Sequence, residues 1–267
     1  MGLALEVIAA QATNIGAGPT NLPAIAGSTL VVRNARLDSR VWLLNFWAHL
    51  QVTGFVQLRS PRLHDNVRGL RAGIRLNESV PRLAEGVKQS LVPQDTLIFE
   101  GSSADAAGNI ESMLALLYYE DLAGGDARLI AFDELMTRGV NVVTVDDTFV
   151  AGVAGGFSGE KAINAGSDLL KANTDYALVG YETTVFVPSI QWRGIDSANL
   201  RVGGPGDPII SEKTRSWFSD LARAFGMPMI PVFNSANRGG WLVDIVNSQV
   251  AASPRITSIL VELAPKR

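Results

Sequence analysis

The chain of 267 residues contains no cysteine and only two histidines, His49 and His64, both in its first half. Without cysteine it forms no disulfide, no thiolate metal site and no thiol nucleophile. Two histidines do not supply the clustered ligands of a metal-binding β-barrel of the cupin type, least of all in both halves of the chain. We therefore assign no catalytic, cofactor-binding or metal-ligating residue, and we expect neither an enzyme nor a cofactor.

Charged residues are also scarce, at 18% of the chain, against the roughly 25% that is usual in soluble domains. Hydrophobic residues make up 47%. Two explanations fit this balance: identical subunits cover part of the surface, or large sheets bury many side chains. No apolar run reaches the 18 residues of a membrane helix, and the N-terminal stretch has no basic segment and contains Glu6. These features predict a soluble protein made in the cytoplasm.

The charges are distributed unevenly along the chain. Residues 33–88 contain ten basic and four acidic side chains, a net charge of +6, whereas residues 89–267 carry a net charge of −8. Such asymmetry is typical of a face for nucleic acid or an anionic membrane. It also fits arginines that pair with acids of the second half or of a neighbouring subunit. The second interpretation is favoured because aromatic residues, which interleave with basic ones in single-strand binders, are only 7% of the chain.

Several short patterns resemble catalytic or binding motifs without meeting their requirements. The loop from Gly155 to Lys161 lacks the Gly-Lys-Ser/Thr ending of a phosphate loop. The acidic pair Asp146-Asp147 has no spaced set of further oxygen ligands for calcium. His49 lies in a strand-like run and is expected to be a core or interface residue and not a base. His64-Asp65 is only a fragment of a triad. Three glutamates, Glu100, Glu111 and Glu120, could include the carboxylate pair of a glycosidase, but the outward faces of strands are the favoured explanation for them. The five tryptophans are expected in the core: Trp42, Trp47, Trp192, Trp217, Trp241.

Four segments of the first half return in the same order in the second half. Residues 26–34 match residues 165–173 at five of nine positions, with an offset of 139. The others pair residues 55–59 with 189–193, 66–68 with 199–201, and 110–117 with 256–263, at offsets of 134, 133 and 146. A repeat of this length is too long for a solenoid, so each half is expected to be a small domain of its own.

Short segments rich in β-branched and aromatic residues, separated by Gly, Pro, Asn and Ser, predict strands in both halves. Two segments instead have the apolar stripe of an amphipathic helix, from Asn77 to Gln89 and from Ser211 to Phe225. Ser211 and Glu212 suit the start of the second helix, and Gly226 suits its end. Each half is expected to close with a β-hairpin, formed by residues 95–100 with 110–118 and by residues 241–246 with 256–263.

The repeated halves and the paired helices resemble the double jelly-roll major capsid proteins of tailless icosahedral viruses, including bacteriophages. The resemblance covers most of the chain and rests on architecture, because the family has no diagnostic motif to match. It implies an all-β fold of two tandem jelly-roll β-sandwich domains, residues 1–135 and 136–267. It also places each helix between the sixth and seventh strands of its domain. The chain would be a short member without long tower-forming loops.

The same resemblance implies a homotrimer that forms a pseudo-hexagonal tile and packs into an icosahedral shell, so that the protein would reside in the virion after synthesis in the host cytoplasm. Implied partners are identical subunits, with minor capsid proteins and an internal membrane or the genome as further partners through the basic first half. No specific nucleic-acid sequence is implied. Two alternatives remain: a tandem jelly-roll protein that binds or processes carbohydrate, and a minor virion component such as a spike or adaptor.

Overall fold

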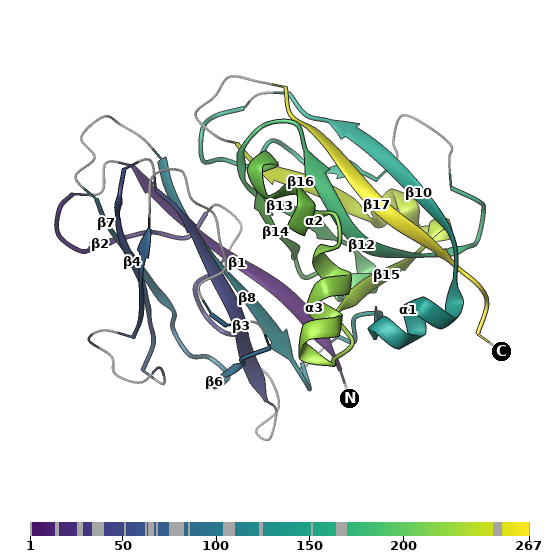
Figure 1. Ribbon diagram of the computed structural model, residues 1–267, viewed down its shortest axis with the longest axis horizontal. Helices are drawn as coiled ribbons and strands as arrows, with labels where there is room; N and C mark the ends of the chain where they lie inside the picture. The colour runs from purple at the N-terminus through teal and green to yellow at the C-terminus, as the bar shows by residue number, and fades with distance from the viewer. Residues whose placement is uncertain are drawn as a thin grey trace.

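The computed structural model describes residues 2–13, 16–25, 29–33, 40–50, 52–61, 63, 67, 69–74, 83–84, 86–103, 110–122, 125–150, 152–163, 170–247 and 253–266. Two β-sandwiches lie side by side, the first drawn in purple to blue and the second in teal to yellow (Figure 1). Within this part of the chain, no helix is long and apolar enough to cross a membrane.

The first sandwich consists of two four-stranded antiparallel sheets. One has the order β1 (Ala4–Thr13), β8 (Ile110–Tyr119), β3 (Val41–His49) and β6 (Gln89–Leu91). The other has the order β2 (Thr20–Asn21), β7 (Ile98–Ser103), β4 (Gly54–Arg59) and β5 (Leu70–Ile74). Numbered along the chain, the strands are thus ordered 1-8-3-6 and 2-7-4-5.

The second sandwich repeats this order with its own eight strands. One sheet runs β10 (Gly139–Thr148), β17 (Arg255–Leu263), β12 (Asp175–Thr183) and β15 (Ile230–Asn234), with β9 (Leu129–Ile130) added at the edge. The other runs β11 (Lys161–Ala162), β16 (Leu242–Val246), β13 (Val187–Arg193) and β14 (Val202–Gly206). Both sandwiches therefore have the double-sheet order of a jelly roll, and the all-β prediction is confirmed.

The predicted closing hairpins are wrong. Within each half the last two strands, β7 and β8 or β16 and β17, belong to opposite sheets. The two strands of each pair therefore lie in different layers, which are about 10 Å apart in packed sheets. Two strands joined by a short polar loop look the same in sequence whether they pair or cross, so alternation could not separate the two arrangements.

The helix predicted between Ser211 and Phe225 is confirmed as two consecutive helices, α2 (Ser211–Thr214) and α3 (Trp217–Phe225). Ser211 is the first residue of α2 and not its cap, while Gly226 ends α3 with a φ of +62°. The pair follows β14 and precedes β15, so it lies between the fifth and sixth strands and not between the sixth and seventh. The other predicted helix runs from Asn77 to Gln89. Its residues 77–82 and 85 lie outside the described residues, and Gln89 begins β6.

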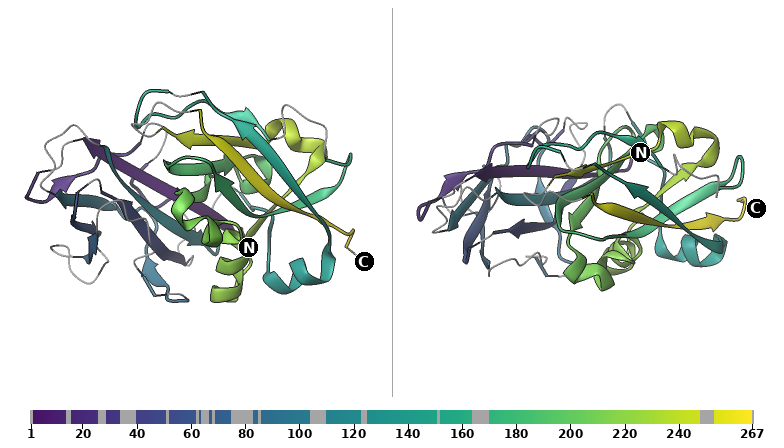
Figure 2. Two further views of the ribbon diagram at one scale, coloured as in Figure 1. Left: turned by 45° about the horizontal axis from the view of Figure 1, so that its top comes forward. Right: turned by 90° about the horizontal axis from the view of Figure 1, so that it is seen from above.

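The remaining helices are short. α1 (Phe132–Arg138) follows β9, and the predicted boundary between residues 135 and 136 falls inside it. Three 3₁₀ turns lie in the second half: η1 (Ile195–Ser197), η2 (Pro208–Ile210) and η3 (Ser235–Gly240). The tilted view and the view from above show that α1, α2 and α3 lie on the same side of the molecule (Figure 2).

A shared irregularity aligns the two halves more accurately than their sequences do. β3 has a bulge between Leu43 and Asn45, whose partners on β8 are the consecutive residues Leu117 and Leu116. β12 has the same bulge between Leu178 and Gly180, whose partners on β17 are Leu260 and Ile259. The structural offset in the last strand is therefore 143, not 146. An odd slip of three residues reverses the faces, so Leu114 and Leu260, matched in sequence, point to opposite sides of their sheets.

The other sequence matches vary in outcome. Gln57 and Gln191 do occupy equivalent places, because each lies on the fourth strand opposite an acid of the seventh strand, Glu100 or Asp244. Residues 26–28, 34, 66, 68 and 165–169 of the remaining matches lie outside the described residues.

Candidate assembly interface

The sheet β1–β8–β3–β6 is buried on both faces, which is unusual for an outer layer of a sandwich. One face packs into the core of the first half through residues such as Ile8 and Ala115. The other face, here called the first outer face, is equally apolar and consists of Leu5, Val7, Ala9, Leu44, Trp47, Leu114, Leu116 and Tyr118. All of these side chains are at most 3% exposed because the second half covers them.

The contacts that cover the first outer face come from α3, β14 and the segment before β13. Trp217 of α3 lies against Trp47, with ring centroids 4.9 Å apart. The backbone N–H of Val7 donates to the carbonyl of Arg201, at 2.7 Å, where β14 meets the edge of β1. Figure 1 shows α3 between the two sandwiches. The halves therefore join face to edge: the sheet of one half receives the fifth strand and the following helix of the other.

Glycines allow this close packing of α2 and α3. A Cβ at Gly180 would collide with the backbone of Arg215, and a Cβ at Gly204 would collide with the indole of Trp217. Trp217 also donates from its indole N–H to the carbonyl of Gly203, at 3.2 Å. On the same helix Phe218 points into the second sandwich, where it contacts Trp192 and Tyr181. α3 therefore links the core of the second half to the first outer face.

On strands β10 and β17 the equivalent surface of the second half is open, whereas α2 covers its β12 part. The shared bulge aligns Leu5, Val7 and Ala9 of β1 with Val142, Thr144 and Asp146 of β10. On β17 the equivalent residues are Val261, Ile259 and Thr257. These six residues form the second outer face. Val142 is 63% exposed, and Ile259 and Val261 are partly exposed, so a surface that is covered in one half remains accessible in the other.

The sheets on the other side of each sandwich share a polar cluster. Arg59 binds Glu100 with both ends of its guanidinium, at 2.6 and 2.7 Å, and Gln57 also donates to this carboxylate. These hydrogen bonds lower the pKa of Glu100 despite its burial, and the same pair raises the pKa of Arg59. The carboxylate is therefore engaged in an ion pair that holds two strands together.

In the second half the matching arginine has a different acid. Arg193 binds Glu160, which also lies 3.1 Å from Arg201, and the hydrogen bond from Arg193 lowers the pKa of Glu160. Asp244, opposite Gln191, accepts from the backbone N–H groups of Ile245 and Gly159 instead. Burial raises the pKa of Asp244. The loop that begins near Gly155 thus covers a sheet, and it leads into β11, which starts at Lys161.

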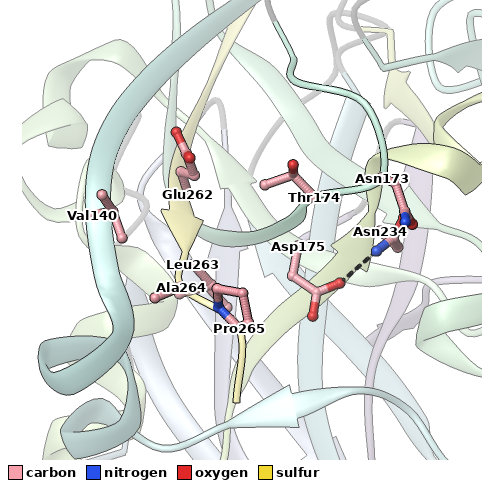
Figure 3. Close-up of a pocket in the computed structure, with 9 residues that line it drawn as sticks. All are labelled: Val140, Asn173, Thr174, Asp175, Asn234, Glu262, Leu263, Ala264 and Pro265. Atoms are coloured by element: carbon pink, nitrogen blue, oxygen red, sulfur yellow. Dashed lines mark hydrogen bonds between the residues drawn. The ribbon is translucent and has the colours of Figure 1, made fainter. Parts of the chain in front are cut away.

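A pocket of about 480 Å³ opens at one end of the second sandwich, lined by residues of β10, β12, β15 and β17 and by the C-terminal segment (Figure 3). Its acids are already paired. Asp175 accepts from Asn234 at 2.8 Å and from Arg128 at 2.7 Å, and Lys171 lies 2.7 Å from Glu262. Burial would raise the pKa of Asp175, but these hydrogen bonds outweigh it and lower the pKa.

The histidine and the tryptophans of the sequence analysis lie where packing requires them. His49, predicted to be a core or interface residue, is 6% exposed and stacks on Phe186 of the second half, at 3.9 Å between ring centroids. Burial lowers its pKa to about 4. Trp47, Trp192, Trp217 and Trp241 are buried, and Trp42 is partly buried beside the ammonium group of Lys88.

The acids singled out in sequence are not brought together. Glu100 lies on β7, whereas Glu111 lies on β8 in the opposite sheet, and Glu120 accepts from the indole of Trp42 beyond the end of β8. Asp146 and Asp147 point to opposite faces of β10. Among the described residues no group of three or more acids or histidines is placed to hold a metal ion. His64, Asp65 and the arginines 62, 68 and 75 lie outside the described residues.

Comparisons with known proteins add little to this geometry. No protein-family model matches the chain, and no curated protein matches it. A solved structure described as the PBSX exported protein XepA overlaps with a TM-score of 0.25 and 10% sequence identity, covering 96% of this chain and 86% of that one. Likeness at this level supports no conclusion about this chain.

Proposed function

We propose that the chain is a structural protein of a viral shell, and specifically a double jelly-roll major capsid protein. The observation that carries this proposal is the relation between the two halves. Jelly rolls also serve as lectins and cupins, so the fold alone does not decide the function. Here, however, two copies of the fold are joined through an apolar face, and the equivalent face of the second copy is accessible.

A face-to-edge contact joins two different surfaces, so it can be repeated. Contacts of this heterologous kind generate rings when the rotation between successive units closes. Each chain supplies two sandwiches with the same strand order. Three chains would therefore place six similar sandwiches around a ring, which gives a trimer with a nearly hexagonal outline. Such tiles pack side by side into a closed shell.

Several acids serve as ion-pair partners within the fold, an arrangement that suits a structural protein. Glu100, Glu160 and Asp175 are each held by arginine, and their lowered pKa values show that they are stabilised as ion-pair partners. A glycosidase needs one carboxyl group with a raised pKa to act as the acid beside its partner carboxylate. Asp244 has a raised pKa, but it accepts backbone hydrogen bonds beneath the loop that includes Gly159.

The oligomeric state of the purified protein tests the proposal. We expect light scattering to give a particle of about 86 kDa, three times the 28.5 kDa chain, and electron microscopy to show hexagonal tiles or shells at higher concentration. A chain that stays monomeric at high concentration would overturn the proposal. Hydrolysis or tight binding of a glycan by that monomer would favour the carbohydrate-active alternative.

A further inference from the structure

The two outer faces are equivalent in position but differ in chemistry. The first outer face presents Leu5, Val7 and Ala9 along β1, all buried, and the second presents Val142, Thr144 and Asp146 along β10. On the neighbouring strand Tyr118, Leu116 and Leu114 correspond to Val261, Ile259 and Thr257. The second outer face is therefore apolar near Val142 and polar near Asp146. A mixed face of this kind is stable in water and still has an apolar centre for docking.

We propose that the second outer face binds the first half of a second copy of this chain, with strand β5 of that copy along the edge of β10. This inference rests on the shell function proposed above and names the surface through which the copies meet. β5 is the fifth strand and the edge of its sheet order, as β14 is in the second half. Within one chain, β14 already meets the edge of β1 through the contact between Arg201 and Val7.

Local charge favours this partner. The β5 region belongs to residues 33–88, which carry a net charge of +6, and the second outer face carries the exposed carboxylate of Asp146. A basic segment beside this carboxylate is favourable at short range, although residues 136–267 as a whole are neutral, with twelve acids and twelve bases. Arg71 of β5 is exposed, with its guanidinium over the ring of Phe55, 3.5 Å from the centroid.

The equivalent positions also give the register of the proposed contact. Val7 corresponds to Thr144 by way of their partners on β8 and β17. Leu58 and Trp192 are equivalent because each follows one of the equivalent glutamines. Leu70 pairs with Leu58, and Val202 pairs with Trp192. The residues just before these two, Gly69 and Arg201, are therefore equivalent as well. The backbone N–H of Thr144 in one copy would therefore face the carbonyl of Gly69 in the next.

Disrupting the centre of the second outer face tests the surface. Val142→Asp places a charge on the docking centre, and we expect it to weaken self-association at least about tenfold, because burying an unpaired charge costs more than 1.4 kcal/mol. The matched control is Val153→Asp, since Val153 is 83% exposed and lies off this face. Circular dichroism and a thermal melt establish that both variants fold. Equal association of wild type and Val142→Asp would overturn the inference while leaving the shell function intact.

Cross-linking tests the partner, and the absence of cysteine gives a clean background. We would co-express chains carrying Thr144→Cys with chains carrying Arg71→Cys and oxidise the product. A disulfide between the two kinds of chain supports the proposed contact. Disulfides formed by Thr144→Cys chains alone would show a symmetric contact between two second outer faces and overturn it. Oligomers without any cross-link would also overturn it, whereas a monomeric wild type would overturn the shell function itself.

Discussion

At the scale of single residues, the histidine at the joint between the halves has a strongly shifted pKa. His49 stacks on Phe186, and burial holds its pKa at about 4, well below the ordinary value of 6.5. A histidine with a lowered pKa favours the folded protein in its neutral form. The folded state binds fewer protons than the unfolded state between the two values, so acid destabilises the protein in that interval.

This linkage predicts a pH dependence that belongs to His49. Its contribution is fully present above pH 6.5 and is lost as the pH falls towards 4, by about 3 kcal/mol in total. Urea unfolding of wild type and His49→Gln between pH 7 and 4 measures the difference. We expect the gap in unfolding free energy to change across this interval, with the wild type losing more. Parallel curves would show that His49 is protonated alike in both states.

Sequence reasoning located some of these residues and missed others. It placed His49 in a core or interface, and it matched Gln57 with Gln191, because both interrupt an apolar strand at the same point. It could not pair Arg59 with Glu100 or Arg193 with Glu160. Such partners are 41 and 33 residues apart, and only the strand order brings them together.

At the scale of elements, periodicity predicted the strands and the helix region around α3, but not their connections. Alternation identifies a strand and its buried face, yet it does not reveal which sheet receives it. The closing strands were therefore read as hairpins. The register of β17 was also wrong, since the apolar runs of β8 and β17 match almost equally well at offsets of 143 and 146. The two bulges, which settle the offset, leave no recognisable mark in the sequence.

The stripe on α3 makes a prediction that distinguishes its residues. Phe218 is fully buried against Trp192, whereas Leu221 of the same helix is only partly buried. Phe218→Ala is expected to lower the unfolding free energy by about 3–5 kcal/mol, because it leaves a cavity in a closed core. Leu221→Ala should cost less. Equal losses in chemical denaturation would mean that α3 is rotated relative to the arrangement described here.

At the scale of the whole molecule, the repeat in sequence indicated two similar sandwiches but not how they join. The face-to-edge joint depends on an apolar outer face that sequence could not distinguish from a core face. On β1 and β8 both faces are apolar, so the strands read as continuous runs. The polar residues of β10, by contrast, show where the same surface is not covered within the chain.

Local charge should govern how fast copies meet. If the basic β5 region of one copy docks beside Asp146 of another, association slows as salt screens the attraction. Arg71→Glu should lower the association rate at low salt and flatten its salt dependence. Arg223→Glu is the matched control, because Arg223 is exposed on α3 of the second half and pairs with Asp220. Stopped-flow light scattering at several salt concentrations measures both. An unchanged salt dependence in Arg71→Glu would contradict this electrostatic model.

The joint between the halves also has a consequence for synthesis. Ala4 pairs with Tyr119, so a ribosome must translate almost half of the chain before the first sheet can form. That sheet then has an apolar outer face, and its cover, Trp217 of α3, is added about a hundred residues later. During this interval the nascent first half presents Leu116 and Trp47 to the solvent. Other nascent copies could bind there, so the order of synthesis makes the first half the aggregation-prone part and the second half its intramolecular chaperone.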